Sequence, residues 1–145
     1  MKSATELELY LHEKIPLTAT MGVQVTECTD SRLVLTAPLE PNRNHVQTAF
    51  GGSLHALATL SCYSLLWWLL RRPEAHIVVR ESTMQYDRPV EGELQAICAC
   101  PAPAELARFQ RDFARKNKAR IPLEAVIAFR GETAARFHGV FVALR

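Results

Sequence analysis

The chain has 145 residues, the length of one ordinary domain, and 48% of them are hydrophobic while 22% are charged. This balance is typical of a folded globular protein and excludes a disordered or low-complexity chain. The 17 Lys and Arg residues against 15 Asp and Glu residues leave a net charge of +2, which argues against nucleic-acid binding because that function usually requires a strong basic excess. We therefore expect one domain over residues 1–145, with its site in the core or between copies of the chain.

The first part of the chain predicts a helix and a strand hairpin. Residues 3–13 have the spacing of a short amphipathic helix, and Pro16 ends any helix there. Residues 22–29 and 32–39 alternate between apolar and polar side chains, as half-buried strands do, and the dipeptide 30–31 between them is typical of a tight turn.

A long uncharged run follows a polar loop. Between residues 46 and 70 the chain has no Asp, Glu, Lys or Arg. Gly51 and Gly52 stand near its start, and Ser53 suits the N-cap of a helix over residues 53–70 that is apolar on nearly every side. The run is long enough to span a bilayer. Because only its later part is strongly apolar, we favour a buried central helix and no membrane association.

The remainder predicts four more strands and a second longer helix. The strands cover residues 75–86, 93–100, 121–130 and 133–144, and the helix covers residues 104–117. Short connections between strands imply antiparallel pairing. Six strands bury an all-apolar helix most economically by curving around it. The predicted fold class is therefore α+β, with a curved antiparallel sheet wrapped around the central helix.

The start of the chain and its cysteines favour the cytoplasm. A charged amphipathic stretch follows Met1, so no secretory signal is visible. The four cysteines form no C-x-x-C pair and have no zinc-finger spacing, and we interpret them as small buried hydrophobes in a reducing compartment, with no metal site. They are Cys28, Cys62, Cys98 and Cys100.

Two motifs resemble a known superfamily. The first runs from Asn44-His45 through Thr48 to Phe50-Gly51-Gly52-Ser53-Leu54, and the second is the turn Tyr86-x-Arg88-Pro89-Val90-x-Gly92. Together they resemble the hotdog-fold thioesterase superfamily, in particular its small bacterial thioesterase-like domains, which also occur fused to acetyltransferase domains. The resemblance implies a hotdog fold and a homodimer with a continuous sheet and active sites at the dimer interface, and it leaves a tetramer open.

The resemblance also implies hydrolysis of acyl thioesters of coenzyme A or of an acyl-carrier protein, with coenzyme A as part of the substrate and no other cofactor. The N-terminus of a helix presents free N–H groups and a positive dipole end, so the Gly51 N–H is expected to bind the thioester oxygen. Asn44 matches the amide that holds the attacking water in many members, and His45 beside it could act as a base. The alternatives are an Asx turn at Asn44 and an exposed loop histidine.

Thr59 departs from the better-known branches, which carry Asp or Glu eight residues after the first glycine of the motif. A threonine hydroxyl is a poor base, although it can orient water. His55 and Tyr63 lie one turn before and after Thr59 on the same helix face, which predicts a polar strip along the site. The alternative is that all three bond to backbone carbonyls in the core. The missing carboxylate keeps a non-catalytic acyl-ligand binding or sensing domain as the alternative function.

Other residues are expected to bind substrate rather than to react. Arg88 is expected either to contact a phosphate or to form a salt bridge. Residues 104–120 carry six basic and two acidic side chains, a patch that suits coenzyme A phosphates or an acidic carrier protein, although such a face can also be merely solvated. Four further residues around the motif glycine are expected to line the substrate site: Thr48, Phe50, Gly52 and Ser53.

Overall fold

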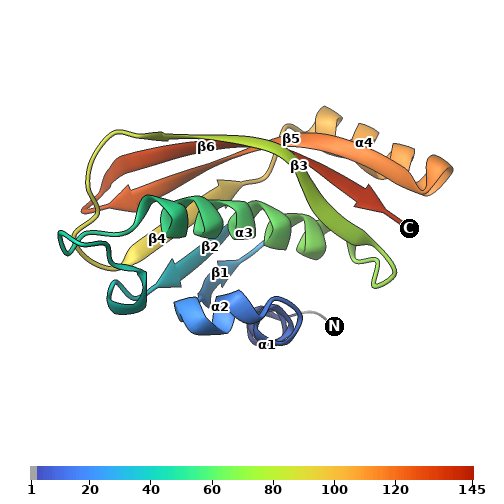
Figure 1. The fold of residues 1–145 in the computed structure, drawn as a ribbon. Coiled ribbons are helices and arrows are strands. Elements are labelled where there is room, and N and C mark those ends of the chain that lie inside the picture. The colour runs from blue at the N-terminus through green and yellow to red at the C-terminus, as the bar shows by residue number, and fades with distance from the viewer. Residues whose placement is uncertain (1–2) are drawn as a thin grey trace.

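Strands form where the sequence alternates, and every strand pair is antiparallel. The computed structural model describes residues 3–145. Its six strands form one sheet in the order β1-β2-β4-β5-β6-β3, which curves around a long helix (Figure 1). The predicted α+β class is confirmed. The strands are β1 (Gln24–Cys28), β2 (Arg32–Ala37), β3 (His76–Tyr86), β4 (Leu94–Ala99), β5 (Lys118–Phe129) and β6 (Glu132–Leu144).

The central helix α3 (Gly51–Leu70) fills the concave side of the sheet and contacts five of the six strands, β2 to β6. A fully buried leucine contributes about 1.5–3 kcal/mol relative to an exposed one, so this helix and the sheet stabilise each other strongly. The predicted N-cap at Ser53 is wrong. The helix begins two residues earlier because Phe50 has extended backbone and its carbonyl accepts the Ser53 N–H at 2.9 Å. The buried residues of α3 are Leu54, Leu57, Ala58, Leu60, Ser61, Cys62, Ser64, Leu65 and Leu66.

By length and composition alone, α3 is apolar enough to cross a membrane, with a mean hydropathy of 1.3 over its most apolar window. Half of that window is buried inside the fold. The position of α3 in the core, packed against the sheet, therefore explains its high hydropathy, as the sequence predicted.

The two N-terminal helices lie below α3 in Figure 1, next to β1, and a 3-10 turn adjoins the second of them. Helix α1 (Ala4–Lys14) matches the prediction for residues 3–13, but α2 (Pro16–Met21) was not predicted. Proline ends the preceding helix because it lacks an N–H, yet it suits the first turn of a new one, where that N–H has no partner. A 3-10 turn, η1 (Glu40–Asn42), follows β2 and contacts α2.

The last helix, α4 (Pro103–Lys116), lies on the opposite side of the sheet from α3 and packs against β5 (Figure 1). It buries Phe109 and Phe113 and turns its basic side chains outward. Strand β5 begins three residues before the predicted position because Lys118 already pairs with Leu144 of β6. The predicted turn at Gly131 is confirmed, with φ of +75° there.

Strand β3 forms one edge of the sheet and pairs only with β6 among the described strands. Nearly all of its residues are exposed or half-buried, and Val78, Val79 and Tyr86 are large apolar side chains open to solvent. Unpaired strand edges invite pairing with another chain.

Candidate functional site

The start of α3 leaves backbone donors without partners. The first N–H groups of any α-helix lack intrahelical acceptors, and among the described residues no side chain caps this end. The Tyr86 hydroxyl, from β3, donates to the Gly51 carbonyl at 2.9 Å. Burial raises the pKa of Tyr86, which keeps this donor protonated. Gly51 and Gly52 therefore present N–H groups at the positive end of a 20-residue helix.

Gly52 leaves room for the Phe50 ring. A Cβ atom at Gly52 would lie 2.4 Å from Phe50 Cε2, so the ring would have to move away from the helix start. The Phe50 ring is 57% exposed and lies over the first turn of the helix. The glycine pair therefore allows both the tight entry into α3 and close access to its backbone.

Asn44 and Thr48 close the loop before the helix. Asn44 Oδ1 accepts the N–H groups of Val46 at 2.9 Å and Thr48 at 3.1 Å, and its Nδ2 donates to Thr48 Oγ1 at 2.8 Å. The structure thus contains the Asx-type turn that was the alternative for Asn44. Nδ2 carries a second hydrogen, which leaves one donor for a water molecule. His45 lies beside it on the exposed surface of the loop.

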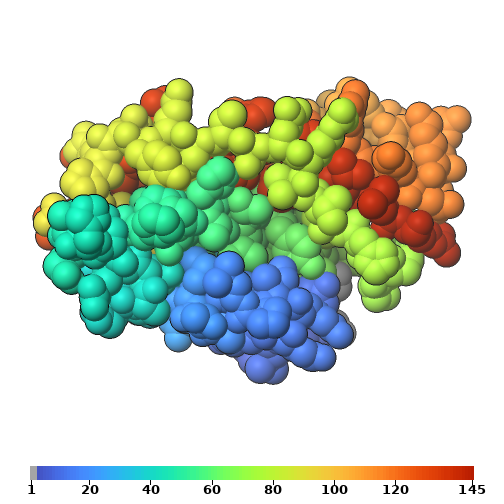
Figure 2. All heavy atoms as spheres, in the orientation of Figure 1, coloured from blue at the N-terminus to red at the C-terminus, as the bar shows by residue number. Residues whose placement is uncertain are grey.

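His55, Thr59 and Tyr63 lie on the half-buried side of α3 but bond to three different elements. Figure 2 shows that α3 reaches the surface between β3 and the N-terminal helices. His55 Nε2 is 2.9 Å from the Ser82 hydroxyl of β3, and the Tyr63 hydroxyl is 3.1 Å from that of Tyr10 in α1. Burial, with that bond, raises the pKa of Tyr63 well above its ordinary value.

Thr59 itself donates to a backbone carbonyl of its own helix, that of His55, at 2.9 Å. This is the structural alternative that the sequence left open for it. Its hydroxyl oxygen still has lone pairs free to accept a hydrogen bond. Eight residues of helix separate Thr59 from Gly51, a distance of about 12 Å along the axis. Thr59 therefore cannot touch a thioester bound at the Gly51 N–H of the same subunit.

Two grooves, each of about 290 Å³, flank the start of α3. One lies toward β3 and the turn after it, and Gly51 and Arg88 line it. Arg88 forms an ion pair with Glu132, so the salt-bridge alternative describes its contact in the structure. The other groove lies toward α2 and η1, and three of the predicted residues line it: Phe50, Gly52 and Ser53.

Sequence reasoning missed Tyr86, Ser82 and the residues of α2 as parts of this region. Tyr86 stood in the turn motif but was assigned no role, because nothing local shows that its hydroxyl reaches Gly51. The bond joins residues that are 35 positions apart. The same is true of the bond between His55 and Ser82, which are 27 positions apart.

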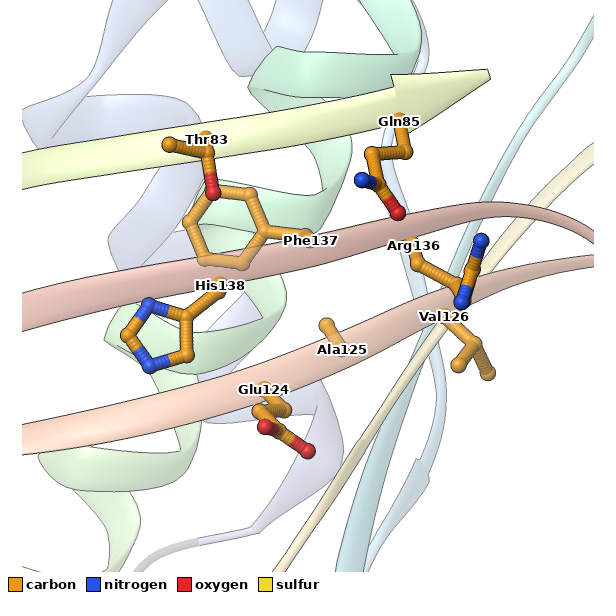
Figure 3. Close-up of a pocket in the computed structure, with 8 residues that line it drawn as sticks. All are labelled: Thr83, Gln85, Glu124, Ala125, Val126, Arg136, Phe137 and His138. Atoms are coloured by element: carbon orange, nitrogen blue, oxygen red, sulfur yellow. The ribbon is translucent and has the colours of Figure 1, made fainter. Parts of the chain in front are cut away.

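A separate recess of about 380 Å³ lies on the outer side of strands β3, β5 and β6. Figure 3 shows the side chains of Glu124, Arg136 and His138 in front of the strands, with α3 behind them. Arg136 also pairs with Asp87 at 3.1 Å. The sequence-predicted site residues do not line this recess, so the start of α3 stays the candidate site.

Comparisons with known proteins agree with the observed fold. Residues 4–145 match the model of a family described as "Putative thioesterase (yiiD_Cterm)". A solved structure of a protein of unknown function from Chlorobaculum tepidum is 35% identical, with a TM-score of 0.92, and the match covers 98% of this chain and 94% of that one.

Two further solved structures are described as thioesterases. A "putative thioesterase" from Shewanella oneidensis is 26% identical with a TM-score of 0.83, and the match covers 98% of this chain and 97% of that one. A thioesterase from Haemophilus influenzae is 11% identical with a TM-score of 0.79, covering 100% of this chain and 92% of that one. The second likeness shows the fold alone.

Proposed function

We propose that this chain, which belongs to the "Putative thioesterase (yiiD_Cterm)" family, hydrolyses acyl thioesters of coenzyme A or of an acyl-carrier protein. The family match and the similar structure from Shewanella oneidensis confirm the resemblance to the hotdog-fold thioesterases and support thioester hydrolysis in general. The observation that carries the finer proposal is the uncapped start of α3, where glycine N–H groups lie between two grooves.

The thioester carbonyl oxygen would accept the Gly51 N–H at the positive end of α3. Negative charge develops on this oxygen when water attacks the carbonyl carbon, and a fixed backbone donor stabilises that charge more than it stabilises the neutral carbonyl. Asn44 would hold the attacking water through its second Nδ2 hydrogen. His45 would take a proton from the water while the C–O bond forms, and it would return this proton to the sulfur as the C–S bond breaks to release the thiol.

The site needs a second copy of the chain. Thr59 lies about 12 Å along α3 from Gly51 of its own subunit, so it would act at the site of the partner subunit, whereas His55 lies only one turn, about 6 Å, from Gly51. The exposed edge of β3, with Val78 and Val79, supports pairing of two copies into a continuous sheet. We propose a homodimer on this basis, and a cytoplasmic location because all four cysteines are free thiols.

The carrier end of the substrate would meet basic side chains. Arg88 is exposed and lines the groove beside Gly51, so it can exchange its partner Glu132 for a phosphate group. Helix α4 and the start of β5 carry a further basic cluster. It lies on the opposite side of the sheet from α3, so it would attract coenzyme A or an acidic carrier protein at long range and would not contact the thioester at Gly51 of the same subunit.

A specific observation favours a second candidate function. Thr59 stands where better-known branches carry a carboxylate, and its hydroxyl donates to a backbone carbonyl. A domain without an effective base would bind acyl thioesters without turning them over.

One experiment separates the two functions. The dimeric protein is incubated with acyl-coenzyme A thioesters of graded chain length, and released thiol is detected. We expect turnover for at least one chain length, and a large loss of turnover with retained binding in Asn44→Ala. Binding without thiol release at any chain length would instead establish the non-catalytic function.

A further inference from the structure

The groove beside Gly52 has a composition unlike that of its neighbour. Helix α2, the 3-10 turn η1 and the first two turns of α3 form it, and we refer to it as the α2 groove. In Figure 2 the blue N-terminal helices and the teal loop over residues 40–50 meet beside the start of α3. None of its nine lining side chains is charged: Leu17, Thr20, Met21, Pro41, Asn42, Phe50, Gly52, Ser53 and Ala56.

The walls of the α2 groove are held together before any ligand binds. Asn42 is 2% exposed, and its Nδ2 donates to the carbonyls of Met21 at 2.9 Å and Pro38 at 2.8 Å. The Asn42 carbonyl accepts the Phe50 N–H at 2.7 Å. These bonds tie α2, η1 and the start of α3 to one another, so the groove is preformed, as most small-molecule sites are.

Two large apolar side chains stand open at this groove. Leu17 is 55% exposed and Phe50 is 57% exposed, and they line it from α2 and from the residue before α3. Large apolar side chains that stay exposed along one concave surface favour an apolar occupant. The groove beside Gly51, by contrast, includes the charged side chains of Asp87 and Arg88.

A thioester has two different halves on either side of its carbonyl group. The acyl group is apolar, whereas the carrier is polar and, in coenzyme A, bears phosphates. If the carbonyl binds at the start of α3, one half extends past Gly51 and the other past Gly52. We propose that the α2 groove is the acyl subsite, and that the groove lined by Arg88 takes the carrier side. This assignment rests on the proposed thioesterase function and deepens it.

The size of the α2 groove sets the class of acyl group. A volume of about 290 Å³ lies just below the range for small-molecule sites, roughly 300–1,000 Å³. The groove therefore favours short, uncharged acyl groups, because the part of a longer chain that exceeds this volume stays in solvent. A terminal carboxylate inside the groove is disfavoured because no lining side chain can pair with its charge.

The first test is Leu17→Trp, with Leu9→Trp as the matched control. Both leucines are exposed residues of neighbouring N-terminal helices, but Leu9, 64% exposed, lies outside the groove. We expect Leu17→Trp to lower kcat/KM about tenfold for butanoyl- and hexanoyl-coenzyme A and to change acetyl-coenzyme A less than twofold. Leu9→Trp should leave the whole chain-length profile unchanged.

A second variant narrows the α2 groove from the opposite wall. Ala56→Phe fills it from α3, and Thr5→Phe places the same side chain on the exposed surface of α1 as the control. Melting curves of all four variants establish that they fold. An unchanged profile in both folded groove variants, with an active wild type, overturns the acyl subsite. A wild type that hydrolyses none of the thioesters overturns the proposed function instead.

Discussion

The two ends of α3 are built in opposite ways. At the C-terminal end, Asp30 Oδ1 accepts the Trp68 indole N–H at 2.9 Å and an Arg71 guanidinium N–H at 3.2 Å, and the Arg71 guanidinium lies 5.7 Å from the centre of the Trp68 ring. At the N-terminal end no described side chain caps the helix, and Gly51 and Gly52 lie between two grooves.

This difference separates stability from function along one helix. Both ends of an α-helix leave backbone groups without partners, and folded proteins normally satisfy them with side chains or water. At the C-terminal end, Asp30, Trp68 and Arg71 bond to one another at the exposed surface, and they line neither of the two grooves. Where donors stay open beside preformed grooves, the substrate can supply the acceptor, so we expect changes at the N-terminal end to alter catalysis and changes at the C-terminal end to alter stability.

The largest expected effect comes from Gly51→Pro. Proline is well tolerated at the first helical position, and the extended backbone of Phe50 (φ −62°, ψ 132°) suits a residue before proline. The variant should therefore fold, but it removes the N–H that binds the thioester oxygen. We expect a loss in kcat of about 100- to 1,000-fold, the cost of removing one oxyanion donor, measured by thiol release.

The control for Gly51→Pro is Gly51→Ala, which retains the N–H. Its Cβ would lie 3.4 Å from the Tyr86 ring, at the edge of ordinary contact. We expect at most a loss of a few-fold in kcat. Equal losses in the two variants would show that bulk at Gly51, and not the missing donor, explains the effect.

We expect the Cys28 thiol, near Asp30 and the C-terminal end of α3, to react slowly with alkylating agents. Cys28 ends β1 next to the turn that carries Asp30. Burial and the Asp30 charge raise the pKa of Cys28 from 9.0 to about 11. At pH 9 its thiolate is then roughly fiftyfold scarcer than that of an unperturbed thiol, so alkylation of Cys28, followed by peptide mass spectrometry, should be slower by about that factor.

The same raised pKa fixes the sign of a stability change. The folded state favours the protonated Cys28 thiol, so its contribution to stability is fully present below pH 9 and is lost as the pH rises through about 11. In Cys28→Ser this alkaline loss should be smaller in urea unfolding curves. Rapid alkylation of Cys28 at pH 9 would contradict both expectations.

A change at Asn44 tests the N-terminal end of α3 with a smaller expected loss of turnover. Asn44→Asp keeps the oxygen that accepts the Val46 and Thr48 N–H groups and replaces the Nδ2 donor with an oxygen, to which the Thr48 hydroxyl can donate instead. We expect about a tenfold loss of turnover with an unchanged melting temperature, the value of roughly one hydrogen bond, whereas Asn44→Ala should lower both. If Asn44→Asp retains full turnover, Asn44 only closes the loop and another group holds the water.

Local patterns predicted the elements of this fold, and long-range contacts determined their ends. The uncharged run from residue 46 predicted a buried central helix because composition alone excludes an exposed one. The start of that helix was wrong because Ser53 was weighed by capping preference, whereas the Phe50 ring over Gly52 and the Tyr86 bond to Gly51 fix the actual start. Helix α2 was missed because six residues are too short to show a helical period.

In the candidate site, too, the local contacts could be predicted from the sequence and the long-range contacts could not. The Asx turn at Asn44 could be anticipated because asparagine bonds to backbone groups two to four residues away. The partners of His55 and Tyr63, by contrast, come from β3 and α1. Their shared helix face followed from their spacing, but which neighbour each one meets depends on the curvature of the whole sheet.

The smallest expected effect is that of Asp30→Ala, near the C-terminal end of α3. The variant removes one charge-assisted acceptor of Trp68 and Arg71, but Asp30 is 74% exposed and Arg71 is 62% exposed, so solvent screens most of the interaction. We expect a loss of about 1 kcal/mol or less, a drop of roughly 3 °C in Tm, with kcat/KM for acyl thioesters within twofold of the wild type. Asp30→Asn, which keeps an acceptor for the Trp68 N–H, should fall between the two. If Asp30→Ala instead reduced kcat as strongly as Gly51→Pro, the two ends of α3 would not be functionally separate, because a change about 30 Å along the helix would then control the chemistry at Gly51.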